Sequence, residues 1–283
     1  MDFGVAVSNM HKNLALNLNL LTKIVVEAEN LGFNSFFTMD HYMLPWGNET
    51  VETWTFLTYV AAQTSKIRLG TCVTPIPLRP PQILAKQIST LDLLSNGRII
   101  FGVGAGWYQP EFEGYSQWDN PAVRVEKTEE GLRLMIKLWT EAKVNFEGKY
   151  YMVKDAVLEP KPIQKPYPPI WFGSTGKRML NLTAKMGDGW IPLGPRWART
   201  YITPEEYREK VEKINFKLKS LGRKIKFTHA ILVGVAENLK TQIEEIEAYK
   251  KAGTEYFVLG LPKLEKSLEQ AKIFAKEVIP SFK

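Results

Sequence analysis

Short apolar runs alternate with longer amphipathic stretches along the whole chain. The first run covers residues 3–7, and the next segment carries apolar residues at helical spacing until Gly32 ends it. The same order returns seven more times, which predicts eight strands, each followed by a helix. The predicted strands are 3–7, 33–39, 67–73, 98–103, 170–172, 189–191, 227–233 and 256–259. The predicted helices are 18–31, 52–63, 80–94, 121–142, 177–186, 204–221, 239–252 and 265–279.

One segment interrupts this alternation. Residues 144–157 alternate apolar and polar positions around Glu147-Gly148, which predicts a β-hairpin. Five prolines follow between residues 159 and 169, so that stretch must be extended. Because both flanks continue the strand–helix order, we interpret 144–169 as an insertion lying over one end of a barrel.

Eight strand–helix units in 283 residues predict the α/β class and a (β/α)8 TIM barrel, with the insertion at about 144–169. A doubly wound open sheet is the alternative, but eight successive units with one interruption favour a closed barrel. We expect residues 1–283 to form one barrel domain.

The composition is that of a globular protein, with 45% hydrophobic and 24% charged residues. No run of about 18 apolar residues is present, so no membrane-spanning helix is expected. The first residues lack the pattern of a secretory signal, which predicts a cytoplasmic protein. The one cysteine, Cys72, excludes an intrachain disulfide, and three scattered histidines predict no metal site.

The net charge of +7 does not by itself indicate a nucleic-acid partner. The densest group of cations, at 217–226, closes one predicted helix and opens a strand, where lysine and arginine complement the helix dipole. We therefore expect a small-molecule substrate, with neither nucleic acid nor a membrane as partner.

Catalytic groups of such barrels lie at the carboxyl ends of the strands, where the loops converge. Asp40 and His41 follow the second predicted strand there, and a histidine can exchange a proton near neutral pH. Asp40 could orient His41 or raise its basicity, although adjacent residues need not bond. The alternative is a structural histidine bonded to a backbone carbonyl. His229 lies within a strand and is interpreted as a packing residue, whereas the role of His11 stays open.

Two glycine-rich turns and several carboxylates leave further functions open. The turn 173–176 leaves a strand and opens a helix, so it could bind a phosphate or be a plain turn with a Ser/Thr cap. The pattern at 102–106 is a weak nucleotide fingerprint, since no Rossmann half surrounds it. Glycosidase-like carboxylate pairs stay possible among Asp40, Glu49, Glu111 and Glu113.

Several motifs occur in an order that is typical of one protein family. Through them the chain resembles the bacterial luciferase-like superfamily of flavin- and deazaflavin-dependent barrel oxidoreductases. They extend from Thr38-Met39-Asp40-His41 to Gly187-Asp188-Gly189-Trp190. Between these lie the motifs at 67–75, 78–81, 85–87, 90–92, 95–98, 102–107, 160–164 and 169–174. The chain is most similar to the subgroup that uses the deazaflavin coenzyme F-420.

The resemblance implies roles for particular residues. Asp40 would contact the cofactor, His41 would be the catalytic histidine, and Trp46 is the nearest match to a tryptophan that stabilises the reacting centre. The family also has a non-prolyl cis peptide behind the cofactor ring, which implies a cis Cys72–Val73 bond. The further cofactor contacts that it implies are Thr74, Ala105, Gly106, Gly173, Ser174, Thr175 and Gly176.

One position departs from the glucose-6-phosphate dehydrogenases of this subgroup. Where those enzymes carry a proton-donating glutamate after the strand-four glycines, this chain has Trp107, and Glu111 follows four residues later. The difference argues against that sugar phosphate as substrate. Glu111 joins His41 and Trp46 as a catalytic candidate.

These observations predict an oxidoreductase that transfers a hydride between coenzyme F-420 and a small organic substrate, with His41 as acid or base. The first alternative is an FMN-dependent monooxygenase that uses reduced flavin and oxygen. A non-catalytic flavin-binding barrel and a hydrolase using Glu111 or Glu113 are further alternatives. The resemblance also implies a homodimer.

Overall fold

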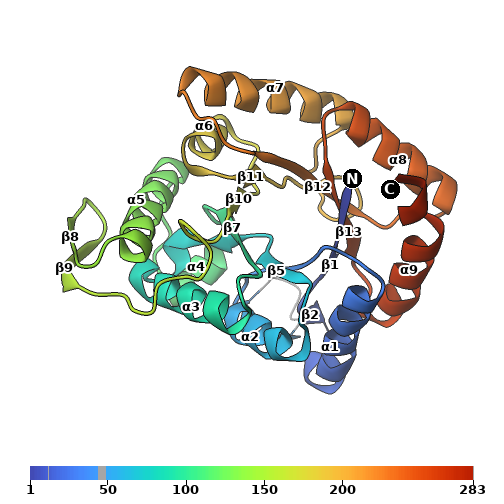
Figure 1. The fold of residues 1–283 in the computed structure, drawn as a ribbon, viewed down its shortest axis with the longest axis horizontal. Helices are drawn as coiled ribbons and strands as arrows, with labels where there is room; N and C mark the ends of the chain where they lie inside the picture. The colour runs from blue at the N-terminus through green and yellow to red at the C-terminus, as the bar shows by residue number, and fades with distance from the viewer. Residues whose placement is uncertain (12, 44–48, 283) are drawn as a thin grey trace.

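The computed structural model describes residues 1–11, 13–43 and 49–282 (Figure 1). Eight parallel strands pair side by side, and the pairing of β10 with β7 closes them into a barrel, as predicted. Their order around the barrel is β10-β11-β12-β13-β1-β3-β5-β7. The strands are β1 (Asp2–Val7), β3 (Ser35–Thr38), β5 (Arg68–Thr71), β7 (Ile99–Gly104), β10 (Ile170–Phe172), β11 (Gly189–Trp190), β12 (Thr228–Gly234) and β13 (Tyr256–Leu261).

The eight predicted helices surround this barrel (Figure 1). Asn120 caps α5 by accepting bonds from two backbone N–H groups, and Thr203 forms a capping box with Glu206 at the start of α7. The helices are α1 (Leu14–Asn30), α2 (Thr53–Gln63), α3 (Pro81–Leu94), α5 (Pro121–Thr140), α6 (Lys177–Met186), α7 (Pro204–Ser220), α8 (Leu239–Lys251) and α9 (Leu264–Glu277).

Side chains alternate between the barrel interior and the layer under the helices. Phe37 stacks on Trp171 inside the barrel at 5.7 Å between ring centroids, and Trp171 meets Tyr256 edge-on at 5.2 Å. Residues one position away along the same strands, such as Phe36 and Phe257, belong to the larger cluster under the helices. The interior is therefore a packed core, and ligands must bind at an end of the barrel.

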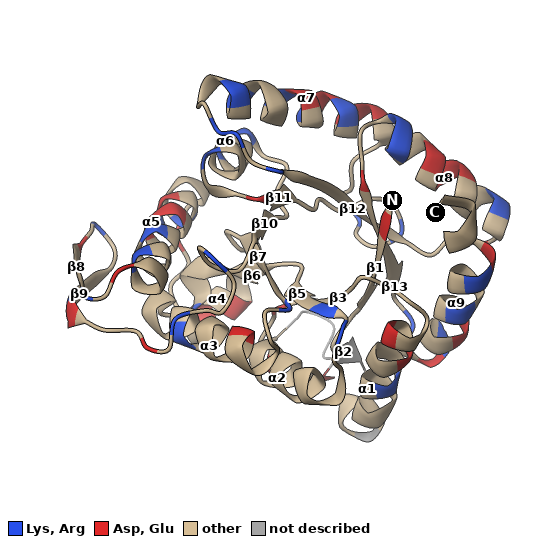
Figure 2. Cartoon of the chain, in the orientation of Figure 1, with Lys and Arg blue, Asp and Glu red and all other residues tan. Residues whose placement is uncertain are grey.

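Charged residues of both signs are interspersed along the outer helices (Figure 2). The helices in this view therefore carry a mixture of positive and negative residues. In the part of the chain that the structure describes, no helix combines the length and the apolar character needed to cross a membrane.

The predicted insertion is present, but its two parts lie in different places. Strands β8 (Val144–Glu147) and β9 (Met152–Ala156) form the antiparallel hairpin, which projects beyond α5 in Figure 1. Glu130 of α5 accepts backbone N–H groups at the hairpin tip, from residues 149, 150 and 151. Only the proline-rich part reaches the barrel end, where Gln164 donates to the carbonyl of Ile99 at the start of β7. The expectation that the whole insertion covers a barrel end was wrong for the hairpin.

Several short elements have no counterpart in the sequence prediction. Helix α4 (Gln109–Tyr115) spans seven residues and contains both a proline and a glycine, which conceal helical periodicity. Strand β2 (Met10–His11) pairs with β4 (Glu49–Thr50), and β6 (Thr74–Pro75) pairs with β7. Two 3-10 helices, η1 (Ile76–Leu78) and η2 (Ile279–Phe282), complete the set. Each of these elements is too short to show a hydrophobic period.

Gly102 on β7 provides a test of barrel packing. A Cβ at this position would lie 1.7 Å from the carbonyl oxygen of Thr71 on β5, whereas a Cβ at Gly176 would have no neighbour within 4 Å. Because backbone cannot yield as a side chain does, we expect Gly102→Ala to lower the free energy of unfolding by about 3 kcal/mol or more. The control Gly176→Ala should change it by about 1 kcal/mol at most. Urea unfolding monitored by tryptophan fluorescence measures both, and equal stabilities would contradict the packing argument.

Candidate active site

His41 follows β3 at the carboxyl end of the barrel and is bonded to a buried carboxylate. Its Nδ1 lies 2.9 Å from Oε2 of Glu111, a residue of α4 whose side chain is 1% exposed. The other oxygen of Glu111 accepts the backbone N–H of Tyr42 at 2.6 Å and that of Met43 at 3.2 Å. Such bonds orient the imidazole ring, and a bond at Nδ1 makes Nε2 the nitrogen that could exchange a proton with a ligand.

Asp40 does not orient His41, contrary to the hypothesis from the sequence. Its carboxylate is buried, with Oδ1 2.7 Å from Nη2 of Arg79 and Oδ2 accepting a bond from Nε1 of Trp54 at 3.3 Å. Burial lowers the pKa of Arg79, but the negative charge of Asp40 opposes it, and the net direction is upward. The carboxylate partner of His41 is instead Glu111, 70 residues further along the chain.

An exposed tryptophan lies beside His41. The ring of Trp107, which is 59% exposed, meets the imidazole edge-on at 5.9 Å between centroids and also contacts Tyr108 at 5.4 Å. An aromatic wall therefore borders the outer side of the histidine. Trp46, which the resemblance indicated for this region, lies outside the described residues.

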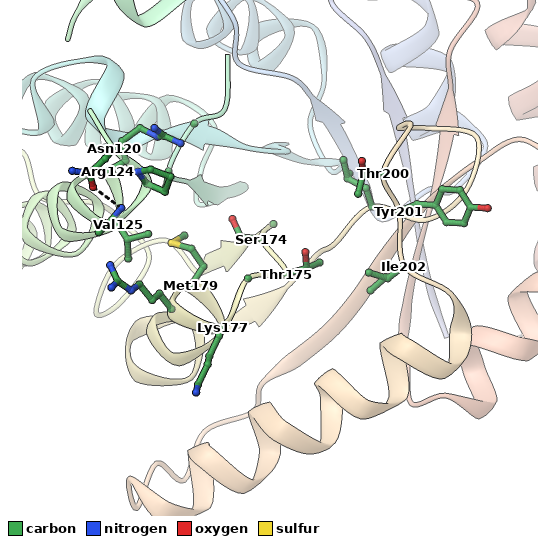
Figure 3. A pocket seen from close by; sticks show the side chains of 18 residues that line it. Asn120, Arg124, Val125, Ser174, Thr175, Lys177, Met179, Thr200, Tyr201 and Ile202 are labelled. Atoms are coloured by element: carbon green, nitrogen blue, oxygen red, sulfur yellow. Dashed lines mark hydrogen bonds between the residues drawn. The ribbon is translucent and has the colours of Figure 1, made fainter. Parts of the chain in front are cut away.

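A pocket of about 800 Å³ opens beside this group. The turn at residues 173–176 lies between the start of α5 and the segment around Tyr201 (Figure 3). Ala105 and Gly106 also line the pocket, and the next residue is the Trp107 that contacts His41. His41 and Glu111 are not among the described lining residues, and the segment 105–107 connects the pocket with the histidine.

The electrostatics of the pocket favour an anionic group. Its lining includes the cations Arg124, Lys177 and Arg178, and the described lining residues include no carboxylate. Helix α6 begins here after Gly176, which provides no side-chain cap for the first N–H groups. These N–H groups and the helix dipole can therefore receive a phosphate or a carboxylate.

Glycines allow close backbone approach around Val73. A Cβ at Gly104 would lie 2.6 Å from a methyl carbon of Val73, and one at Gly173 would lie 2.7 Å from the other. Gly106 has a φ of +80°, and its added Cβ would lie 2.3 Å from the ring of Phe112. Larger residues would displace these side chains, so the glycines shape the floor of the site.

The Cys72–Val73 peptide bond is cis, as the resemblance implied. Cys72 is buried, which raises the pKa of its thiol to about 12 and makes the thiolate scarce. Thr74 is also buried and donates to the hydroxyl of Thr71 at 3.1 Å. The side chains of Cys72 and Thr74 are therefore buried, whereas that of Val73 is only partly buried.

The structure brings together part of the predicted site and adds residues to it. The described lining of the pocket contains six of the predicted cofactor contacts: Ala105, Gly106, Gly173, Ser174, Thr175 and Gly176. The lining does not include Asp40, Cys72, Val73 or Thr74, whose roles toward a cofactor stay predictions. Sequence reasoning missed Asn120 and Arg124, because nothing in their local pattern distinguishes them from an ordinary helix start.

Part of the loop after β11 shapes the pocket. Leu193 and Tyr201 line the cavity. Arg196 has a φ of +60° and forms an ion pair with Glu245 of α8 instead.

Comparison with known proteins identifies the family. The profile of the luciferase-like monooxygenases matches residues 1–275. The chain belongs to this family. One relative, the F-420-dependent glucose-6-phosphate dehydrogenase of Microbacterium testaceum, is 32% identical over 197 residues, which cover 68% of this chain and 56% of that protein. The FMNH2-dependent dimethylsulfone monooxygenase of Pseudomonas putida is 26% identical over 234 residues, covering 82% and 61%.

The luciferase-like fold of the chain also matches solved structures along its full length. An F-420-dependent secondary alcohol dehydrogenase in complex with an F-420–acetone adduct superposes with a TM-score of 0.85 at 23% identity, covering 100% of this chain and 99% of the other. A monooxygenase from Streptomyces bottropensis gives 0.84 at 20% identity, covering 100% of both. These likenesses establish the fold. The chain spans 56% and 61% of the length of the two curated relatives named above.

His229 lies away from the site, on the outer side of β12. Its Nε2 is 3.0 Å from Oδ1 of Asn215 on α7, and its Nδ1 is buried with no partner among the described residues. Burial lowers the pKa of His229 from 6.5 to about 4. The residue therefore packs as an uncharged group, in agreement with the sequence interpretation.

This burial predicts a pH dependence of stability. Between pH 6.5 and about 4 the unfolded chain binds a proton that the folded chain does not, so this contribution is present above pH 6.5 and is lost as the pH falls. The expected loss is about 3 kcal/mol. Urea unfolding at pH 7 and pH 4.5 should show a smaller decrease for His229→Gln than for the unaltered protein. Equal decreases would contradict a neutral buried His229.

Proposed function

We propose that this chain is an oxidoreductase that transfers a hydride between coenzyme F-420 and a carbon atom of a small organic substrate. The observation that carries the proposal is the bond between Nδ1 of His41 and the buried Glu111, beside a pocket with an anion-binding end. The F-420-dependent relatives support the choice of cofactor. His41 is the proposed acid or base.

The residues present fit a cofactor that carries a ring and a phosphate. The pocket volume of about 800 Å³ lies in the range of cofactor sites. The turn 173–176 and the start of α6 would hold the phosphate, while Ala105 and Gly106 would contact the ring. When bound, coenzyme F-420 supplies a ring carbon that accepts or donates a hydride.

The protein's own contribution is to manage the accompanying proton. Oxidation of an alcohol releases its hydroxyl proton, and Nε2 of His41 would accept it while Glu111 stabilises the imidazolium. Reduction of a carbonyl would use the reverse transfer. Trp107 would exclude water on the outer side of the imidazole and favour an apolar substrate over a sugar phosphate.

The second candidate is a monooxygenase that uses reduced FMN and oxygen. Two observations favour it: the relative that acts as a dimethylsulfone monooxygenase, and Trp107 in the place of the proton-donating glutamate. The same phosphate turn and the same histidine would serve either cofactor. One barrel domain, a homodimer and a cytoplasmic location stay predictions.

Binding of the two cofactors discriminates these proposals. We expect coenzyme F-420 to bind more tightly than FMN in a titration followed by cofactor fluorescence. Removing both cations at the start of α6, in Lys177→Met/Arg178→Met, should raise its Kd by about tenfold, because charge-assisted contacts to the phosphate are lost. The control Lys217→Met/Lys219→Met, at the end of α7, should leave the Kd unchanged.

Each alternative result of this titration has a clear meaning. Tighter binding of FMN would replace the first proposal with the monooxygenase, and oxygen uptake with dimethylsulfone would be the next assay. Binding of neither cofactor would contradict the assignment of the pocket.

Substitutions of His41 and Glu111 test the acid–base role of His41. With isopropanol and glucose 6-phosphate as trial substrates, turnover is followed by the fluorescence change of coenzyme F-420. We expect His41→Ala to lower kcat by about 10²–10⁴-fold. Glu111→Gln should lower it by about tenfold or more, because the imidazolium loses its anionic partner. His229→Gln is the control, and unchanged turnover in His41→Ala at equal cofactor affinity would refute the role of His41.

A further inference from the structure

Arg79 contacts the residues on both sides of His41. Its guanidinium Nη2 lies 2.7 Å from Oδ1 of Asp40, and the guanidinium carbon lies 4.7 Å from the centroid of the Tyr42 ring. Its side chain is 7% exposed, and its Nη1 is 3.5 Å from Oε1 of Glu52 at the start of α2. A single buried cation thus holds the residues that flank the proposed acid or base.

Two buried carboxylates lie next to His41, and each has a different partner. Asp40 and Glu111 are both 1% exposed, and a buried carboxylate is costly unless it is paired. Arg79 pairs with Asp40, whereas Glu111 bonds to the imidazole and to two backbone N–H groups. The positive charge of Arg79 therefore leaves Glu111 as the carboxylate whose charge a protonated His41 would balance.

The other titratable groups around this segment are partly exposed, neutral or engaged elsewhere. Glu52 of α2 has a side chain that is 35% exposed, so water screens its charge. Glu49 of β4 accepts the backbone N–H of Ala15 at 2.8 Å. Tyr115 of α4 packs against Tyr42, and burial raises the pKa of Tyr42, so the latter stays neutral. None of these groups replaces the cation that faces Asp40.

We propose that Arg79 is a positioning residue for His41, which neutralises Asp40 and fixes the 40–42 segment so that Glu111 governs protonation of the imidazole. A role of Arg79 in catalysis rests on the proposed function, whereas its effect on the protonation of His41 does not. Without Arg79, the charge of Asp40 would favour the protonated imidazole.

The experiment is an NMR titration of the imidazole signals in the cofactor-free protein. The chain has three histidines, so His41→Gln and His229→Gln assign the signals of these two residues. In Arg79→Met we expect the titration midpoint of His41 to rise by about one pH unit. Arg79→Lys, which keeps the charge, should stay near the unaltered midpoint. His229, on the outer side of β12, is the internal control and should not move.

Two further variants separate charge from packing. The double variant Arg79→Met/Asp40→Asn should return the His41 midpoint toward its original value, because it removes both charges. Asp40→Asn alone should lower the His41 midpoint, because the positive charge of Arg79 then has no anionic partner in Asp40. This variant tests the proposal if Arg79→Met does not fold. A folded Arg79→Met with an unchanged His41 midpoint, or an Asp40→Asn midpoint that does not fall, would overturn the proposal.

These results are independent of the cofactor. If the midpoints move as expected but neither cofactor binds, the proposed function fails while the control of His41 by Arg79 stands. If His41→Ala retains its turnover, only the acid–base role of His41 fails.

Discussion

The carboxylate of Glu111 connects the parts of the candidate site. It is buried, and it accepts three bonds from the segment that follows β3, one of them from the ring of His41. These bonds replace the water that the buried carboxylate has lost. The side chain of Glu111 therefore connects helix α4 to the loop after β3. The orientation of the imidazole depends on this contact.

The second constraint is close approach of the backbone at the mouth of the barrel. Glycines at the ends of β7 and β10 lie against the side chain of Val73, and a Cβ at either would come within 3 Å of it. Helix α6 likewise begins directly after a glycine, so its first N–H groups have no side-chain cap and can receive an anion. Gly173 and the start of α6 border the pocket, whereas Val73 and Gly104 are not among its described lining residues.

Charge is distributed so that each buried group near His41 has its own partner. Arg79 balances Asp40, and Glu111 faces the imidazole. Further out, the pocket lining carries cations, and the helices carry both signs (Figure 2). Part of the net positive charge of the protein therefore lies at the pocket, whereas the helices in view carry residues of both signs.

The hydrophobic pattern alone determined the eight strand–helix units, because strands buried on both faces and amphipathic helices differ in length and period. The glycine-rich turn at 173–176 was also predicted correctly as a connection between a strand and a helix. The pattern could not reveal α4, whose seven residues contain Pro110 and Gly114, nor the hairpin's position against α5. Sequence proximity suggested Asp40 as the partner of His41. Only the tertiary structure decided for Glu111, because adjacent residues point in different directions while folding brings together groups 70 positions apart.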